Sequence, residues 1–287
     1  MSAPSRPIVI DSIVGMREAV RAERAAGRTV SLTPTLGALH AGHFAHVERA
    51  AEIVDTAVVS IFVNPTQFTT EEDLAKYPRD LDADLDALSA FTVAYVFAPS
   101  VAEMYPTGPT ETKITAGPMG LLYEGAARPG HFDGVLTVVA KLLSIVGPDV
   151  VTFGQKDAQQ LFLVRRMIDE LNIPTRVEII DTVREDDGLA LSSRNQFLDA
   201  RQRRAARTLS IALEAAASSG DRGIDATLAA AQAVFMGEPL VMLDYFKVVQ
   251  PKTFVQVDDD YRGKAIAIVA ATLGSTRLLD NEQIYLN

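Results

Sequence analysis

Three of the four histidines of this chain, His40, His43 and His46, fall within seven residues. A β-branched run at residues 29–33 precedes them, and apolar side chains recur at helical spacing over residues 44–54, which predicts a strand followed by a helix. The first turn of a helix offers unpaired amides and the positive end of the helix dipole, and both hold phosphate. Because His40 and His43 are three positions apart, they share one side of that turn. The pattern predicts a nucleoside triphosphate site built from two imidazoles and backbone amides.

A second interpretation of this segment is that His40 and His43 cap the helix or face solvent. Gly37 and Gly42 favour the ligand site, since a backbone that approaches a ligand closely is often glycine. His46 lies further into the helix, and we expect it at the surface.

A similar strand-to-helix transition is predicted at residues 153–160. Asp157 is placed to cap the helix, with Gln160 at the reciprocal third position. Capping leaves Lys156 unexplained, because a lysine beside a helix N-terminus adds to the positive potential there. Lys156 therefore indicates an anionic ligand.

Other polar segments carry weaker signals. The hydroxyls and guanidinium of residues 191–195 suit phosphate oxygens, but a polar loop explains them equally well. Residues 64–68 and 128–132 mix amide, aromatic and imidazole groups, and taken alone they favour ordinary loops. The acidic run at residues 80–86 is predicted to be a solvated surface rather than a metal cage, although Asp84 could assist magnesium.

Composition narrows the class of protein. The chain has 287 residues, 48% of them hydrophobic and 22% charged, which is ordinary for a soluble globular protein of one or two domains. A net charge of −10 argues against a broad nucleic-acid surface. The absence of cysteine excludes disulfides, thiolate zinc sites and a thiol nucleophile. We find no signal-peptide core or membrane-helix pattern and expect a cytoplasmic protein with no membrane or nucleic-acid partner.

Alternating strand and helix patterns predict an α/β protein with a parallel sheet. Its ligand site is expected beyond the carboxyl ends of the strands, where the motifs lie. Strands are predicted at residues 7–10, 29–33, 57–62, 93–97, 150–153 and 176–180, and helices at 12–26, 43–55, 80–89, 134–146 and 157–172.

The pattern changes after about residue 182. Helices are predicted at residues 201–218 and 224–236, and strands at 241–249, 265–271 and 276–279. We therefore predict two domains, a Rossmann-like parallel-sheet domain at residues 1–182 and a smaller α+β domain at residues 183–287.

Taken together and in order, the motifs resemble those of the pantoate–β-alanine ligase family. His-x-Gly-His alone indicates only the wider nucleotidyltransferase superfamily, which includes class I tRNA synthetases, whereas the collinear set is specific. The matching segments are residues 34–43, 61–68, 77–79, 128–135, 153–160 and 191–195.

The resemblance implies a fold and a reaction. The fold is a Rossmann-like domain with a smaller C-terminal lid domain, usually as a homodimer. In the reaction, ATP and pantoate give a pantoyl adenylate and pyrophosphate with Mg²⁺, and the amine of β-alanine then displaces AMP to give pantothenate.

The resemblance also assigns residues, matched motif by motif. Pantoate would be held by Gln67, Gln160 and His131, and β-alanine by Gln67. The catalytic positions, around the phosphates, are His40, His43, Lys156, Ser192, Ser193 and Arg194, with His43 the proton donor. The positions matching the ATP site are Leu36, Gly37, Ala38, Leu39, His40, Ala41, Gly42, His43, Gly154, Gln155, Lys156, Asp157, Val183, Leu191, Ser192, Ser193 and Arg194.

The chain departs from the family's frequent residues at Leu36, Ala41, Ala158 and Leu191, and Thr66 is one of the two residues common at its position, while each polar group with a chemical task is retained. Two other functions fit His-x-Gly-His. One is a nucleotidyltransferase acting on a phosphate-bearing acceptor, and the other is a nucleotide-binding module without catalysis. Gln67 and Gln160 suit a small hydroxy acid better than a phosphorylated acceptor, and intact His43, Lys156 and Arg194 argue against a loss of catalysis.

Overall fold

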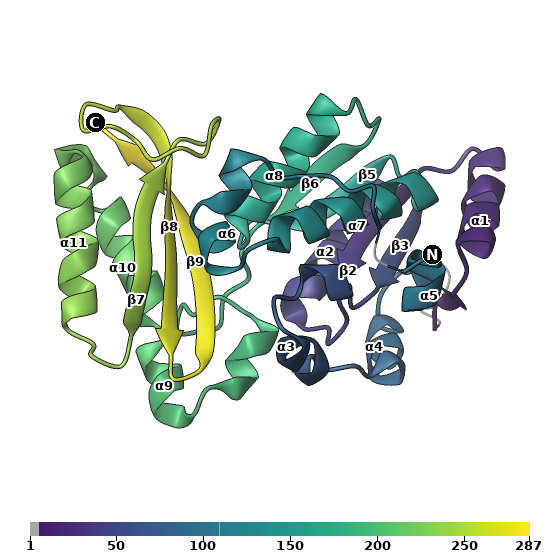
Figure 1. Cartoon of the computed structure of the whole chain (residues 1–287), viewed down its shortest axis with the longest axis horizontal. Helices are drawn as coiled ribbons and strands as arrows, with labels where there is room; N and C mark the ends of the chain where they lie inside the picture. Colours follow the sequence, from purple (N-terminus) through teal and green to yellow (C-terminus); the bar gives the residue numbers. More distant parts are fainter. Residues whose placement is uncertain (1–5, 109) are drawn as a thin grey trace. The chain divides into compact units, whose positions relative to one another are not determined.

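The computed structural model describes residues 6–108 and 110–287. The chain divides into two compact units (Figure 1). The first comprises Met1–Gly154 and Leu163–Ile180, and the second comprises Gln155–Phe162 and Asp181–Asn287. The short segment Gln155–Phe162, which carries Lys156, thus groups with the C-terminal part of the chain.

The first unit contains a six-stranded parallel sheet with the strand order β1-β4-β3-β2-β5-β6. The inner strands β2, β3 and β5 are almost continuously buried, as expected for a parallel sheet covered by helices. The predicted α/β class is confirmed. The strands are β1 (Ile8–Ile10), β2 (Val30–Thr35), β3 (Thr56–Ile61), β4 (Tyr95–Phe97), β5 (Val150–Gly154) and β6 (Arg176–Ile180).

The helices around this sheet begin and end at recognisable signals. Ser12 caps the first long helix by accepting the Gly15 amide at 3.2 Å, and Gly147, in the left-handed region, ends another. The helices are α1 (Ile13–Ala25), α2 (Ala41–Ile53), α3 (Glu71–Lys76), α4 (Leu81–Leu88), α5 (Val101–Met104), α6 (Glu124–Ala127), α7 (His131–Val146) and α8 (Ala158–Glu170), of which residues 158–162 belong to the second unit. Helices α1 and α7 pack together and against β2, while α2 and α4 share an apolar cluster with β3 and β4.

Several short elements were not predicted, because three to six residues are too few for apolar periodicity to show. They are α3, α5 and α6 and the 3₁₀ turns η1 (Pro65–Gln67) and η2 (Pro118–Leu121). Turn η1 matters for the site because it carries Gln67. In the part of the chain that the structure describes, no helix is long and apolar enough to cross a membrane.

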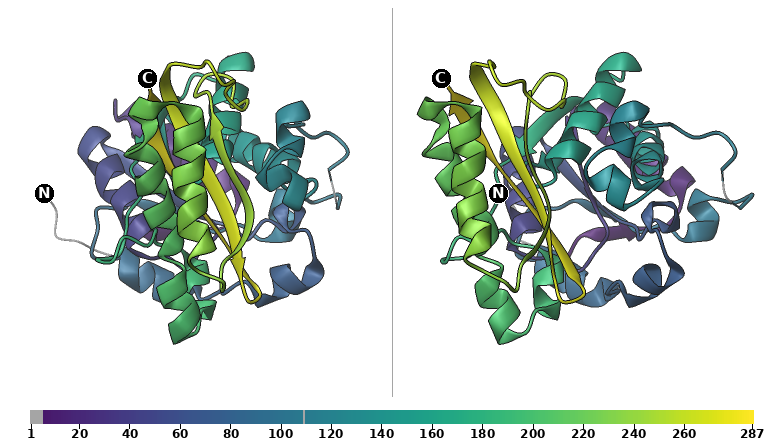
Figure 2. Two further views of the ribbon diagram at one scale, coloured as in Figure 1. Left: turned by 90° about the vertical axis from the view of Figure 1, so that its left-hand side faces the viewer. Right: turned by 60° about the vertical axis from the view of Figure 1, so that its left-hand side comes forward.

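The second unit contains a three-stranded antiparallel sheet, β7 (Met242–Val249), β8 (Gly263–Leu273) and β9 (Thr276–Leu286). Helices α10 (Thr208–Ala217) and α11 (Ile224–Met236) lie side by side on one face of this sheet (Figures 1 and 2). Leu209, Leu213 and Val269 belong to the apolar core between these layers. The remaining elements of the unit are η3 (Ser193–Phe197), α9 (Ala200–Ala205) and η4 (Gly220–Arg222).

Two predicted elements of this unit were wrong in extent. The single helix predicted at residues 201–218 is two helices, α9 and α10, because the chain tightens into a 3₁₀-type turn in which the Leu209 amide donates to the Ala206 carbonyl. The strand predicted at residues 276–279 continues to Leu286. Its polar residues Asp280 and Asn281 hid this continuation, because both are buried in the strand and bind other segments.

Candidate active site

His40 and His43 form a reciprocal cap at the start of α2. Nδ1 of His40 accepts the Gly42 amide at 3.1 Å, and Nδ1 of His43 accepts the His40 amide at 3.2 Å. The two ring centroids are 4.1 Å apart. A neutral imidazole that accepts through Nδ1 carries its proton on Nε2, so both rings are Nε2–H donors. Capping and ligand binding are therefore compatible: one nitrogen of each ring holds the helix start, and the other is the donor.

The backbone amides of the loop before this cap are paired within the protein. The Gly37 amide donates to Thr35 Oγ1 at 3.2 Å. Those of Ala38 and Leu39 donate to the two carboxylate oxygens of Asp84 at 3.0 and 2.8 Å. The imidazoles, rather than these amides, are the groups on which a phosphate site here depends.

Asp84 is the exception in the acidic run of residues 80–86. Asp80, Asp82 and Asp86 are exposed as predicted, but Asp84 is buried against the Gly37 loop. Burial raises the pKa of the Asp84 carboxyl, and the two amide hydrogen bonds oppose that shift. Gly37 has a φ of +82°, and a Cβ there would lie 2.9 Å from Asp84 Oδ2. The carboxylate therefore fixes the loop that leads to the histidines.

His46 is less exposed than was expected for a surface residue. It is partly buried, with Nδ1 3.2 Å from Thr152 Oγ1 on β5. Gly154, at the end of that strand, makes room for the ring, since a Cβ there would lie 3.2 Å from His46 Nε2. His46 thus ties α2 to the carboxyl end of β5.

Gln67 and His131 come together in the first unit, although they are 64 residues apart. Nδ1 of His131 is 2.7 Å from the Gln67 main-chain carbonyl, and Nε2 is 3.2 Å from Arg128 Nη1. Turn η1 lies directly on the first turn of α7, where a Cβ on Gly134 would be 2.3 Å from the Thr66 carbonyl oxygen. The two loops that seemed ordinary when taken singly therefore form one packed structure.

The side chain of Asn64 connects η1 to α7 and to Tyr105 through hydrogen bonds. Its side chain is buried and accepts the hydroxyls of Thr66 and Tyr105 at 3.1 and 2.8 Å. Its amide nitrogen lies 3.3 Å from Gln67 Oε1 and 3.2 Å from the Gly134 carbonyl. Asn64 was not assigned a role from the sequence, because these partners are distant along the chain.

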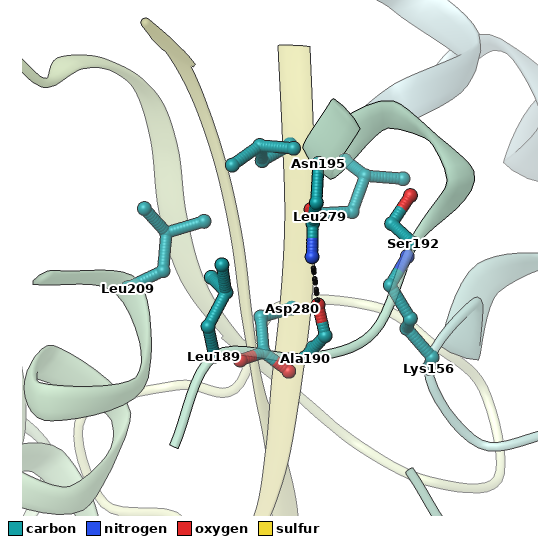
Figure 3. Close-up of a pocket in the computed structure, with 9 residues that line it drawn as sticks. Lys156, Leu189, Ala190, Ser192, Asn195, Leu209, Leu279 and Asp280 are labelled. Atoms are coloured by element: carbon teal, nitrogen blue, oxygen red, sulfur yellow. Dashed lines mark hydrogen bonds between the residues drawn. The ribbon is translucent and has the colours of Figure 1, made fainter. Parts of the chain in front are cut away.

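In the second unit, Lys156 and Ser192 line one small pocket (Figure 3). Figure 3 shows the Lys156 side chain beside Ser192, with the Asn195 amide donating to the Ala190 carbonyl at 3.1 Å. Ser192 caps η3 by accepting the Arg194 amide at 3.2 Å, so Ser193 and Arg194 begin that turn.

The other predicted site positions of this region lie in its loops and at the start of α8. Val183 and Leu191 are paired through a 2.9 Å backbone hydrogen bond. Asp157 directly precedes α8, and Gln160 lies in its first turn.

Two buried residues of β9, not identified from the sequence, organise this region. Asn281 donates through Nδ2 to the carbonyls of Gln155 and Lys156, at 2.9 and 2.7 Å. Asp280 forms a bidentate pair with Arg184, at 2.7 and 3.1 Å. A polar pair inside a strand is the signal that could have found them, because buried polar groups need partners. Asn281 therefore holds the main chain of Lys156.

Among residues 6–108 and 110–287, no group of three or more His, Cys, Asp or Glu side chains could hold a metal ion. Asp84, the one carboxylate considered for magnesium, is committed to two backbone amides. These residues do not form a metal site of their own.

Comparison with known proteins places these features in a family. The family model "Pantoate-beta-alanine ligase" matches residues 8–283. The chain is 55% identical to a pantothenate synthetase of Leifsonia xyli subsp. xyli, with 90% of this chain and 89% of that protein covered. It is 49% identical to a pantothenate synthetase of Nocardia farcinica, with 98% and 85% covered.

Solved structures of proteins with the same two names are also similar to this chain. The pantothenate synthetase of Thermus thermophilus matches with a TM-score of 0.90 and 42% identity, covering 97% of this chain and 99% of that one. A pantoate-beta-alanine ligase of Francisella tularensis, complexed with beta-gamma ATP and beta-alanine, matches with a TM-score of 0.78 and 30% identity, covering 96% and 97%.

Proposed function

The chain belongs to the pantoate–β-alanine ligase family, and on that premise we propose the steps by which it works. It is an ATP-dependent ligase that joins pantoate to β-alanine. The match over residues 8–283 carries this conclusion, because it spans every motif assigned a role below.

In the first proposed step, a carboxylate oxygen of pantoate attacks the α-phosphorus of ATP. The bond from that phosphorus to the bridging oxygen breaks, and pyrophosphate leaves. A free carboxylate is a poor acyl donor, and adenylation turns its oxygen into part of a good leaving group. In the second step the amine of β-alanine attacks the acyl carbon, and AMP leaves with that oxygen while the amide forms.

Negative charge moves onto the leaving pyrophosphate in the first step. We assign its stabilisation to the Nε2–H groups of His40 and His43 and to Lys156, with His43 as the proton donor in a hydrogen bond to the departing pyrophosphate. The orientation of the two imidazoles supports this, because preorganised donors stabilise developing charge at little reorganisation cost. Ser192, Ser193 and Arg194 are assigned to the same phosphates, since hydroxyls and a guanidinium suit phosphate oxygens.

We place the other ATP contacts at the remaining matched positions. They are Leu36, Gly37, Ala38, Leu39, Ala41 and Gly42 before and at the start of α2, and Gly154, Gln155 and Asp157 before α8. Val183 and Leu191, which are hydrogen-bonded neighbours, are assigned to the adenine.

Pantoate is assigned to Gln67 and Gln160, and β-alanine to Gln67. Holding both reactants near one amide brings the amine to the adenylate before water reaches it. Support for Gln67 comes from its anchoring, because a side chain held by Asn64 keeps its orientation.

Mg²⁺ is proposed to enter with ATP, bound to the phosphates, which is how this ion commonly binds at nucleotide sites. We also propose a cytoplasmic homodimer, an assignment that rests on the family resemblance. Sedimentation of the purified chain tests the dimer, and a mass of one chain would contradict it.

The function is tested by incubating the protein with ATP, Mg²⁺, pantoate and β-alanine. AMP, pyrophosphate and pantothenate are expected in equal amounts. If the adenylate forms reversibly, labelled pyrophosphate should be incorporated into ATP when pantoate is present, and β-alanine should not be needed for this exchange. ADP as product would refute the adenylate, and exchange without pantoate would refute the order of the steps.

A further inference from the structure

We propose that His131 and Arg128 are positioning residues, which grip the main-chain carbonyl of Gln67 and so fix where its side-chain amide meets the substrates. This inference rests on the proposed function, in which Gln67 holds pantoate and β-alanine. His131 then acts through Gln67 and does not bind pantoate with its ring nitrogens.

The Gln67 carbonyl receives two donors from the segment around the start of α7. His131 Nδ1 lies 2.7 Å from its oxygen, and Arg128 Nη2 lies 3.3 Å from it. His131 is buried, with 7% of its surface exposed, so this contact is shielded from water. A carbonyl has two lone pairs, and here the protein occupies both.

The position of the ring proton follows from Arg128. A guanidinium has only donors, so His131 Nε2, 3.2 Å from Arg128 Nη1, is the acceptor in that contact. The neutral ring then carries its proton on Nδ1, where it donates to the Gln67 carbonyl. This tautomer is the opposite of the one that capping imposes on His40 and His43.

Glu124 completes the chain of contacts. Its carboxylate is buried, with 3% of the residue exposed, and lies 3.8 Å from Arg128 Nη1. The negative charge compensates the guanidinium, whose side chain is itself mostly buried. Glu124, Arg128 and His131 therefore form a connected series that ends on the Gln67 carbonyl.

Gln67 is consequently held at both ends. Its carbonyl is gripped by His131 and Arg128, and its side-chain oxygen accepts from Asn64 Nδ2 at 3.3 Å. The bond from Asn64 fixes the plane of the side-chain amide, whose Nε2 group has two donors and whose Oε1 retains a second lone pair. The Nε2 donors suit a substrate oxygen, such as the hydroxyl or carboxylate of pantoate or the carboxylate of β-alanine.

The first test is independent of activity. In ¹⁵N-histidine-labelled protein, long-range ¹H–¹⁵N spectra at neutral pH are expected to show His131 as the Nδ1–H tautomer, and His40 and His43 as Nε2–H. A His131→Gln sample assigns the signal. An Nε2–H or doubly protonated His131 would overturn the proposed grip.

The second test uses matched variants. His131→Asn places an amide nitrogen near the position of Nδ1 and keeps a donor to the carbonyl, whereas His131→Gln moves its amide one bond further away. We expect His131→Gln to raise KM for pantoate about tenfold, the scale of one lost hydrogen bond, and His131→Asn to recover most of that loss. Equal losses in both variants, with unchanged melting temperatures, would contradict a role for the donor.

A double-mutant cycle separates positioning from general damage. If His131 acts only through Gln67, then His131→Gln should change KM for pantoate less than about twofold in a Gln67→Ala background. The same loss in both backgrounds would overturn the inference. If Gln67→Ala alone leaves the kinetics unchanged, the proposed substrate role of Gln67 is what fails, and the tautomer measurement still decides whether the grip exists.

Discussion

Replacing Gly134 by alanine tests how closely η1 must lie on α7. Gly134 is in the first turn of α7, and an added Cβ would lie 2.3 Å from the Thr66 carbonyl oxygen and 2.9 Å from the Gln67 amide nitrogen. Ordinary contacts begin near 3.4 Å, so the turn must move by about 1 Å. The obstacle is backbone, which cannot rotate aside as a side chain does.

Two opposing effects set the expected magnitude. Alanine stabilises a helix by about 1 kcal/mol relative to glycine. Overpacking typically costs about 1–3 kcal/mol, so the net effect on unfolding is a loss of up to about 2 kcal/mol. The effect on catalysis is larger, because misplacing a substrate-holding group by about 1 Å can lower kcat/KM about a hundredfold.

The assay combines thermal unfolding with kcat/KM for pantoate. Ser144→Ala, an exposed position of the same helix, is the control, and there we expect a small gain in stability with normal kinetics. A Gly134→Ala protein that melts higher than the parent and turns over normally would refute the close approach.

The other predictions concern the proposed charge-stabilising groups, a buried anchor and an ion pair. His43→Ala and Lys156→Ala should each lower pantoate-dependent pyrophosphate exchange about a hundredfold or more while the fold survives, and near-normal exchange in both would refute their roles. Asn281→Leu should destabilise the protein by about 1–3 kcal/mol and lower exchange as well, because two carbonyls lose their donor, and unchanged stability would contradict this. A hydrogen bond from Arg49 lowers the pKa of Glu178 below 4.5, the ordinary value for this carboxyl. The ion pair between Arg49 and Glu178 therefore stabilises the folded protein fully above pH 4.5, and this stabilisation is lost as the pH falls through the lowered pKa. The melting-temperature difference between parent and Glu178→Gln should accordingly shrink under acid, and a difference independent of pH would contradict the pairing.

Local patterns predicted much of this molecule. Buried runs such as Val30–Thr35 and Val150–Gly154 were recognisable as parallel strands because neither face meets water. The spacing of His40 and His43 predicted their shared turn, since residues three apart on a helix are neighbours.

What the sequence did not reveal depends on distant partners. Asp84 looked solvated among exposed aspartates, yet it meets two amides 45 and 46 residues away. His46 was expected at the surface, but its Nδ1 lies within hydrogen-bonding distance of Thr152 Oγ1 on β5. Asp280 and Asn281 were taken to mark the end of a strand, because buried polar side chains need hydrogen-bond partners. Those partners, Arg184 and the Gln155 carbonyl, lie far away along the chain.

The most direct test of the adenylate is an isotope measurement. Pantoate labelled with ¹⁸O in its carboxylate is converted with ATP and β-alanine, and the AMP is analysed by mass spectrometry. Transfer of one carboxylate oxygen to the α-phosphorus predicts AMP carrying a single ¹⁸O. Unlabelled AMP, or ¹⁸O in pyrophosphate or inorganic phosphate, would contradict acyl activation at the α-phosphate.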